Sequence, residues 1–226
     1  MLHALTPSAM QQHVTIPEAQ PVVRLAQDTP KSRRTRLRIL DSAMTLFAGI
    51  GYNEAVNLKI AEAAGITRGA MLYHFPTRED LIGAAIDHIQ ALRMRRLAEV
   101  SASQPIGADP TAYAIDAYWG LLAETPFVAF AELQAVARTD AMVRNRIAPA
   151  EAAFDHAQIG EQSLAQGGAA ARLQASRDLA RFLLEGMRRA VLTYDAPERT
   201  ERLLTVIKRT AQMLNRKGAA ADLWPE

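Results

Sequence analysis

Side chains that can donate hydrogen bonds gather in one short stretch of this sequence, between Asn57 and Arg78. Two small residues, Gly69 and Ala70, lie among them and would permit close approach to a surface. Guanidinium, hydroxyl and imidazole groups bind phosphate oxygens and the edges of bases. The stretch therefore favours contact with duplex DNA, and the alternative is an ordinary helical hairpin with one hydrated face. The donors are Thr67, Arg68, Tyr73, His74 and Arg78.

A second group of cations lies upstream, where five basic residues fall within the eight positions 31–38. Such a cluster is a candidate phosphate contact, although it could also be the solvated start of a helix. The helix dipole disfavours cations at this end, so their placement suggests an external anion. The full set of residues predicted to contact DNA is Arg33, Arg34, Arg36, Asn57, Thr67, Arg68, Gly69, Ala70, Tyr73, His74 and Arg78.

Two short helices with a tight corner must position these donors. Asn57 is expected to cap the first, and Gly65 ends it in the left-handed conformation that a tight turn requires. Ile66 plugs the corner and Thr67 caps the second helix, residues 68–74. This pattern predicts a helix-turn-helix, whose second helix enters a major groove about 12 Å wide.

Flanking helices complete the expected domain. Residues 32–49 carry one apolar stripe, and Pro76 forces a break after the second short helix. Thr77 caps a long helix at residues 78–100, with Asp80 completing a variant of the capping box. At about 1.5 Å per residue that helix spans roughly 33 Å, enough to link two domains rigidly.

The remainder of the chain predicts further helices and no strand. They are expected at residues 110–124, 127–147, 150–166, 173–192 and 197–217. The fold class is therefore all-α. Three segments follow: a flexible tail at 1–30, a helix-turn-helix DNA-binding domain at 31–77, and a helical regulatory and dimerisation domain at 78–226 that begins with the connecting helix 78–100.

Two segments, TRLRILDSAMTLFAGIGY and LKIAEAAGITRGAMLYHFPTREDLI, resemble the DNA-binding domain of the tetracycline-repressor (TetR) family of bacterial transcriptional regulators. They cover about fifty of the 226 residues, in the order and spacing of the family. The family often carries a tyrosine where this chain has Leu72, and here the tyrosine follows at position 73. The resemblance implies a homodimeric, ligand-responsive regulator, most often a repressor. It also implies that a small-molecule effector binds in the second half and lowers the affinity for DNA.

Candidate residues for that second half follow from its helices. A pocket between helices could be lined by aromatic side chains and a methionine, although plain core packing is the alternative for each. These candidates are Tyr113, Tyr118, Trp119, Phe127, Phe130, Phe154 and Met187. The last two helices are expected to form a four-helix dimer interface, with packing inside one subunit as the alternative. Its candidate residues are Leu179, Phe182, Leu183, Gly186, Ala190, Leu203, Leu204, Ile207, Ala211 and Leu214.

Other chemistries find little support in the sequence. The chain has no cysteine, and it lacks a phosphate-binding loop, a nucleophile elbow and paired histidines at metal spacing, so we expect no enzyme activity, no metal and no cofactor. A net charge of +2 is too small to argue from. Without a long apolar run or a secretory signal, we expect a cytoplasmic protein without a membrane partner. The alternatives are an architectural or interaction protein without effector control, and an enzyme with an attached DNA-binding domain.

Overall fold

The computed structural model describes residues 29–159 and 168–215, without the side chains of residues 156–172. Within these ranges the chain forms nine helices and no strand, so the predicted all-α fold is confirmed. Apart from Thr29 and Pro30, the predicted flexible tail lies outside the described residues, as do the expected helix ends at Gln166 and Lys217. The helices are α1 Pro30–Ile50, α2 Asn57–Ala63, α3 Arg68–His74, α4 Arg78–Ala102, α5 Pro110–Leu121, α6 Thr125–Val136, α7 Ala141–Ile159, α8 Gly168–Val191 and α9 Pro197–Leu214.

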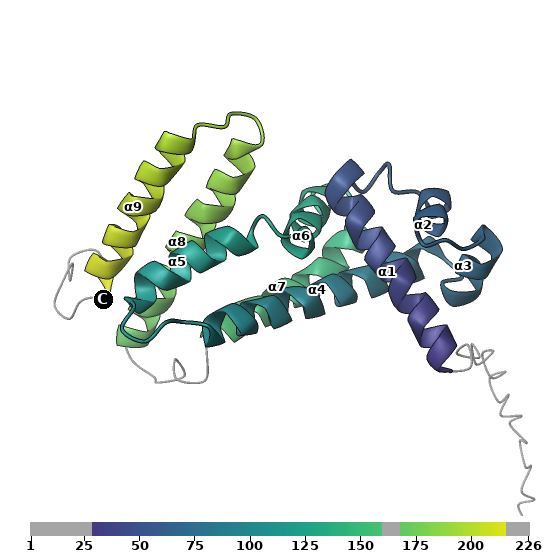
Figure 1. The fold of residues 1–226 in the computed structure, drawn as a ribbon, viewed down its shortest axis with the longest axis horizontal. Coiled ribbons are helices and arrows are strands. Elements are labelled where there is room, and N and C mark those ends of the chain that lie inside the picture. The colour runs from purple at the N-terminus through teal and green to yellow at the C-terminus, as the bar shows by residue number, and fades with distance from the viewer. Residues whose placement is uncertain (1–28, 160–167, 216–226) are drawn as a thin grey trace, which may run out of the picture.

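Helices α1 to α3 form the predicted helix-turn-helix unit at one end of the molecule (Figure 1). Gly65 has a φ of 63°, the left-handed conformation that the corner requires. The Thr67 hydroxyl oxygen accepts a hydrogen bond from the Ala70 backbone N–H at 3.1 Å and so caps α3. Both features confirm the predicted geometry of the corner.

The predicted cap of α2 is wrong. Val56 precedes α2 and makes no side-chain cap, whereas Asn57 is the first residue of the helix. The Asn57 Oδ1 accepts a hydrogen bond from Arg78 Nη1 at 3.1 Å, so this oxygen faces the start of α4. Arg78, which is distant in sequence, thus binds the oxygen that would have accepted a local capping hydrogen bond.

Helix α4 runs from the helix-turn-helix unit into the rest of the molecule (Figure 1). Its capping box is present: Thr77 accepts from the Asp80 N–H, and the Asp80 carboxylate accepts from the Thr77 N–H at 3.0 Å. The buried face of α4 includes Arg93, which is 3% exposed. Its guanidinium lies 3.6 Å from the ring centroid of Phe130 in α6 and 4.2 Å from that of Phe154 in α7. A cation in contact with two rings therefore joins α4 to α6 and α7.

The division between α6 and α7 differs from the predicted one. The helix expected over residues 127–147 is interrupted after Val136, and α7 begins at Ala141. The Asp140 carboxylate accepts from the Val143 N–H at 3.1 Å, which restarts the helix. The new helix then runs through Pro149, where a break was expected. A proline inside a helix loses one backbone hydrogen bond. Helix α7 packs on α4 along its length, and next to the proline Gln90 Nε2 of α4 donates to the Ala150 carbonyl at 2.8 Å.

The buried residues form two clusters, and the first crosses the expected domain boundary at residue 78. It joins the apolar faces of α1 to α4 with Ala129, Phe130 and Leu133 of α6 and Val143 and Ile147 of α7. The second cluster joins α5, α8 and α9 with Phe127 and Phe154. The helix-turn-helix unit shares its core with α6 and α7. A displacement of these two helices would therefore also displace the helices of that unit.

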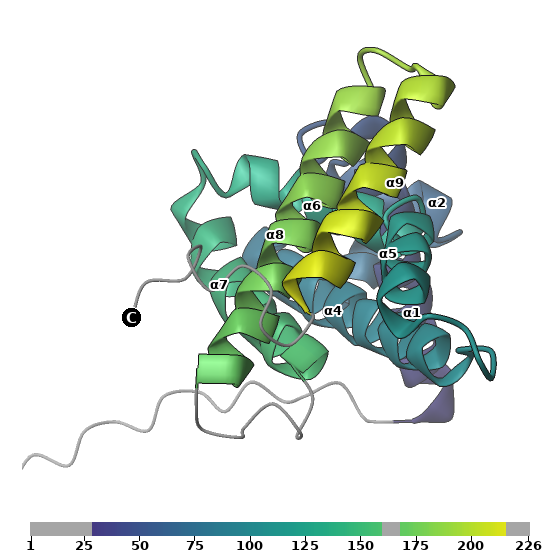
Figure 2. The ribbon, with the colours of Figure 1, turned by 90° about the vertical axis from the view of Figure 1, so that its left-hand side faces the viewer.

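Helices α8 and α9 form an antiparallel pair on the side of the molecule opposite to α2 and α3 (Figures 1 and 2). Figure 2 looks onto this pair, with α5 beside α9. Within the described ranges, no helix combines the length and the apolar character needed to cross a membrane.

Candidate nucleic-acid interface and regulatory sites

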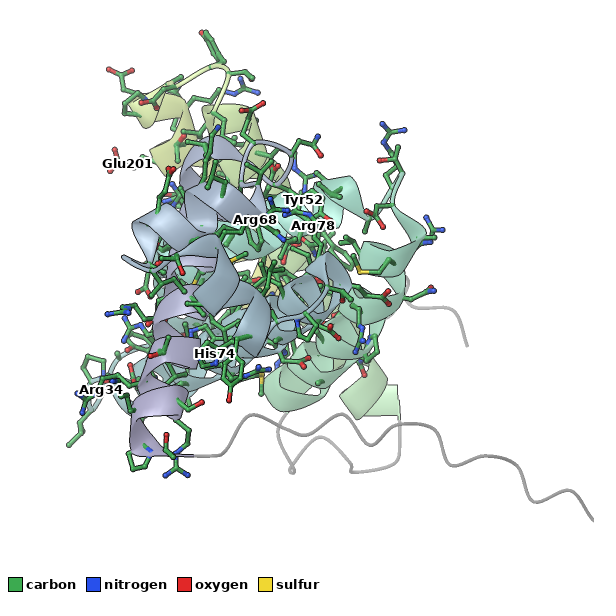
Figure 3. All side chains as sticks on the ribbon, turned by 90° about the vertical axis from the view of Figure 1, so that its right-hand side faces the viewer. Arg34, Tyr52, Arg68, His74, Arg78 and Glu201 are labelled. Carbon is green, nitrogen blue, oxygen red and sulfur yellow. The ribbon has the colours of Figure 1, made fainter. Side chains whose placement is uncertain are left out.

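The outer face of α3 is slim and carries hydrogen-bond donors. Met71 and Phe75 are buried beneath it, whereas Arg68 and Tyr73 are exposed, with 65% of Tyr73 accessible to solvent. Figure 3 views the molecule from this end and shows Arg68 and His74 on the helix-turn-helix unit. A helix whose apolar side is held and whose donor side is free has the shape that a major groove accepts.

Small residues at the start of α3 are not required by internal packing. A Cβ added to Gly69 would meet only the Thr67 hydroxyl, at 4.0 Å, which is an ordinary contact. Gly69 and Ala70 are both exposed. Their small size therefore leaves room outside the protein, where a second surface could approach the backbone of α3.

His74 is the last residue of α3, and its side chain is partly buried. Partial burial and the nearby Arg36 guanidinium lower the pKa of its imidazole below the ordinary value of 6.5. Its ring lies edge-on to that of Tyr73, with 5.4 Å between centroids. In the free protein the neutral imidazole is therefore favoured, and a neutral imidazole can still form a hydrogen bond.

Arg36 connects α1 to α3. Its Nη1 donates to the carbonyl oxygen of His74 at 3.0 Å, and its guanidinium lies 4.1 Å from the ring centroid of Phe75. The side chain is still exposed. Arg36 therefore holds the carboxyl end of α3 in place and keeps part of its charge at the surface.

Arg78 holds the turn between α1 and α2. Its Nη1 donates to the Ala55 carbonyl at 3.2 Å as well as to Asn57, and its Nη2 donates to the Tyr52 carbonyl at 3.3 Å. The guanidinium also lies 5.0 Å from the ring centroid of Tyr52. These contacts give Arg78 a structural role that sequence reasoning missed, since no spacing along the chain reveals three acceptors brought together by a turn.

The first turns of α1 present the basic cluster. Arg33 and Arg34 are exposed, and Arg34 lies at the edge of the view in Figure 3, directed away from the core. Lys59, in the first turn of α2, is a further exposed cation that was not predicted; it forms an ion pair with Glu54 at 3.0 Å. Eight of the eleven predicted DNA contacts are thus exposed and three are partly buried: Asn57, His74 and Arg78.

Most of the predicted pocket residues pack into the core. Tyr118, Phe127 and Phe154 contact one another, with ring centroids 6.1 to 6.4 Å apart, and Phe130 is buried in the other cluster. The other three lie apart from this group. Tyr113 donates a hydrogen bond to the Val100 carbonyl, and Trp119 lies beneath the Arg188 guanidinium. Met187 lines a small cavity between α8 and α9. Tyr118 is the one predicted residue that lines the cavity of about 310 Å³ between α5, α8 and α9. These positions favour core packing for most of the set.

The predicted dimer residues divide into two groups. Six are exposed and form apolar stripes on the outer faces: Leu179, Phe182, Leu183, Gly186 and Ala190 on α8, and Leu203 on α9. Ile207 and Ala211 are instead buried in the second cluster of their own chain, and Leu204 and Leu214 are partly buried. Two exposed apolar residues of α9, Val206 and Met213, were missed although they follow Leu203 at helical spacing.

Comparison with known proteins identifies the amino-terminal region. Residues 39–85 match the family model of the bacterial regulatory proteins, tetR family. The chain is 43% identical over 51 residues to the HTH-type transcriptional regulator AcrR of Shigella flexneri, covering 23% of this chain and 24% of that protein. It is 39% identical over 57 residues to the HTH-type transcriptional repressor KstR2 of Rhodococcus jostii (strain RHA1), covering 25% of this chain and 28% of that one. The match thus spans about a quarter of each relative's length.

The likeness in fold extends further. The multidrug binding protein EbrR, in a crystal structure of its complex with imidazole, superposes with a TM-score of 0.56 over 82% of this chain and 97% of its own, at 22% identity. At that identity the likeness shows the fold alone. The amino-terminal match and the shared fold agree with the capped, donor-bearing α3: residues 39–85 of this chain match the DNA-binding region of the tetR family of bacterial regulatory proteins.

Proposed function

We propose that the protein is a transcriptional regulator that binds a palindromic DNA operator as a homodimer and responds to a small-molecule effector, acting as a repressor. The observation that carries the proposal is α3, a short capped helix with a buried apolar side and an exposed side bearing Arg68 and Tyr73. Its residues in the groove would read base edges, and the cations of α1 would bind the flanking phosphates.

A twofold dimer follows from the small size of the reading surface. Helix α3 has seven residues and reaches few base pairs, so two copies on a palindromic site would supply the specificity that one lacks. The exposed apolar stripes of α8 and α9 are the surface we assign to the dimer, because large exposed apolar patches mark interaction sites.

The route from a regulatory half to α3 passes through the turn between α1 and α2. The Tyr52 N–H donates to Glu132 Oε1 of α6 at 2.9 Å, and Arg78 of α4 binds the Tyr52 carbonyl. The turn is close-fitting, since a Cβ at Gly51, whose φ is 84°, would lie 3.0 Å from Glu132 Oε1. An effector that prefers a different placement of α4 or α6 would therefore shift this turn and lower the affinity for DNA. The complex of EbrR with imidazole is consistent with such a ligand.

Selection of bound fragments from random and genomic DNA pools tests the proposal as a whole. The enriched sequence should be an inverted repeat whose half-sites have centres about one helical turn of DNA, or a multiple of it, apart. Failure to enrich any sequence, or enrichment of a site without twofold symmetry, would contradict it.

Replacing Arg33 and Arg34 together with alanine should weaken binding to every DNA sequence and flatten its dependence on salt. For each phosphate that the protein no longer neutralises, the slope of log K against log salt falls by about one. Titrations at several salt concentrations measure this slope. Arg95→Ala is the matched control, because Arg95 is exposed near the other end of α4. A slope that is unchanged in the double variant would show that the cluster is only solvated surface.

Glu132→Ala should destabilise the fold by about 1–3 kcal/mol, because it leaves the part-buried Tyr52 N–H without its acceptor. Glu132→Gln retains an acceptor oxygen and should recover most of this stability. Urea denaturation of the two variants measures the difference in free energy of unfolding. Equal destabilisation in both variants would mean that the carboxylate charge stabilises the fold and that the hydrogen bond to the turn does not.

A further inference from the structure

The cavity between α5, α8 and α9 is the space in the described residues that best suits a small molecule. Its volume of about 310 Å³ lies at the lower end of the range of about 300–1,000 Å³ usual for ligand sites, so its occupant would be small. Part of its wall is apolar and includes Ile115 of α5 and Ala180 and Leu184 of α8. Such a wall would accept a hydrocarbon body.

The cationic part of the wall is formed by neighbouring positions of α8, while Thr111, Tyr118 and Asn215 add polar groups from elsewhere. Ser176, Arg177 and Arg181 line the cavity, and their spacing puts them on the same face of the helix as Ala180 and Leu184. Ser176 is buried, and the side chain of Arg181 is 11% exposed. The described residues of the wall thus include two arginines and no aspartate or glutamate.

The carboxylates that balance Arg181 lie outside this wall. Its Nη1 donates to Asp155, while its Nε lies 3.6 Å from Glu185 Oε1 and makes no hydrogen bond. Glu185 in turn accepts a hydrogen bond from the Tyr118 hydroxyl at 2.7 Å. A buried guanidinium N–H without a hydrogen-bond partner is costly, and an anion bound beside Arg181 would supply an acceptor once the side chain turned toward it.

We propose that this cavity binds a small amphipathic carboxylate, with its anionic group at Arg177 and Arg181 and its hydrocarbon part against Ile115 and Leu184. The proposal deepens the proposed function, since this carboxylate would be the effector, but the binding step itself does not depend on DNA. A carboxylate at Arg181 would compete with Asp155 and Glu185 for the guanidinium. The change would reach α4, because Arg93 interacts electrostatically with Arg181, Glu185 and Tyr118.

Calorimetric titration of the full chain with octanoate, octanol and octylammonium, in the absence of DNA, tests the proposal. The three probes share a hydrocarbon tail and differ in charge. We expect octanoate to bind at least about tenfold more tightly than octanol, and octylammonium not to bind, because a charge-assisted hydrogen bond is worth more than a neutral one. Equal affinity for octanoate and octanol, a preference for octylammonium, or no binding of octanoate would each overturn it.

Three variants assign the site. Arg177→Gln should weaken octanoate binding about tenfold or more, whereas Arg189→Gln, at an exposed position of the same helix that does not line the cavity, should leave it unchanged. Ala180→Phe should fill the cavity and abolish binding; full affinity in this variant would place the site elsewhere and overturn the proposal. Thermal unfolding without ligand checks that each variant is folded. Operator binding is measured separately, so a failure of the DNA proposal would leave the calorimetric result intact.

Discussion

Arg68→Ala is expected to weaken operator binding by about 2–6 kcal/mol per dimer, since each of two copies would no longer make a base or phosphate contact worth about 1–3 kcal/mol. Arg68 is the exposed guanidinium at the first position of α3, the end of a recognition helix that reaches the base edges. Tyr73→Ala should also weaken binding, because this ring is 65% exposed and projects from the same helix. Gel-shift titration against the selected operator measures the affinity of both variants.

Controls distinguish weaker DNA binding from unfolding of the protein. Arg68 and Tyr73 are exposed, so their removal should change the free energy of unfolding by no more than about 0.5 kcal/mol. Tyr73→Phe keeps the ring and removes the hydroxyl, which distinguishes packing on the DNA from a hydrogen bond to it. Should both alanine variants bind the operator as tightly as the unaltered protein, α3 would not be the reading helix.

The helix-turn-helix could be predicted because its determinants are local. Gly65, Thr67 and the Thr77–Asp80 box each act on residues at most four positions away, so their types and spacing were enough. Asn57 failed as a cap because Arg78, twenty-one residues later, takes its oxygen. Glu132 could not be found at all, since its partner Tyr52 lies eighty positions away and an isolated glutamate on a helix carries no signal.

The second half of the chain was harder to predict because several of its helices are apolar on more than one side. Ile207 and Ala211 of α9 pack into their own chain, whereas Leu203, Val206 and Met213 face outward, and both sets follow helical spacing. Periodicity identifies a helix but does not say which of two apolar stripes faces the core. The same limit applies to the aromatic residues expected to line a pocket. A position in the core and a position facing a cavity require the same residue types, so residue type does not distinguish them.

Phe182→Glu should convert the proposed dimer into a monomer and thereby remove most of the operator affinity. Phe182 is 60% exposed at the centre of the outer stripe of α8, a position that single-chain packing does not explain. Burial of such a side chain contributes about 1.5–3 kcal/mol, and twofold symmetry doubles this to about 3–6 kcal/mol before the cost of desolvating two carboxylates is added. Analytical ultracentrifugation across a range of protein concentrations measures the change in dimer dissociation constant.

Ile106→Glu is the matched control, because Ile106 is a fully exposed apolar residue in the connection between α4 and α5. It introduces the same charge at an apolar surface position and should leave both the dimer and operator binding unaltered. If Phe182→Glu stays dimeric while remaining folded, the outer faces of α8 and α9 do not form the interface. A monomer that binds the operator with full affinity would contradict the proposal of a twofold dimer on a palindromic site. One seven-residue helix would then be enough to recognise the site, and paired half-sites would not be needed.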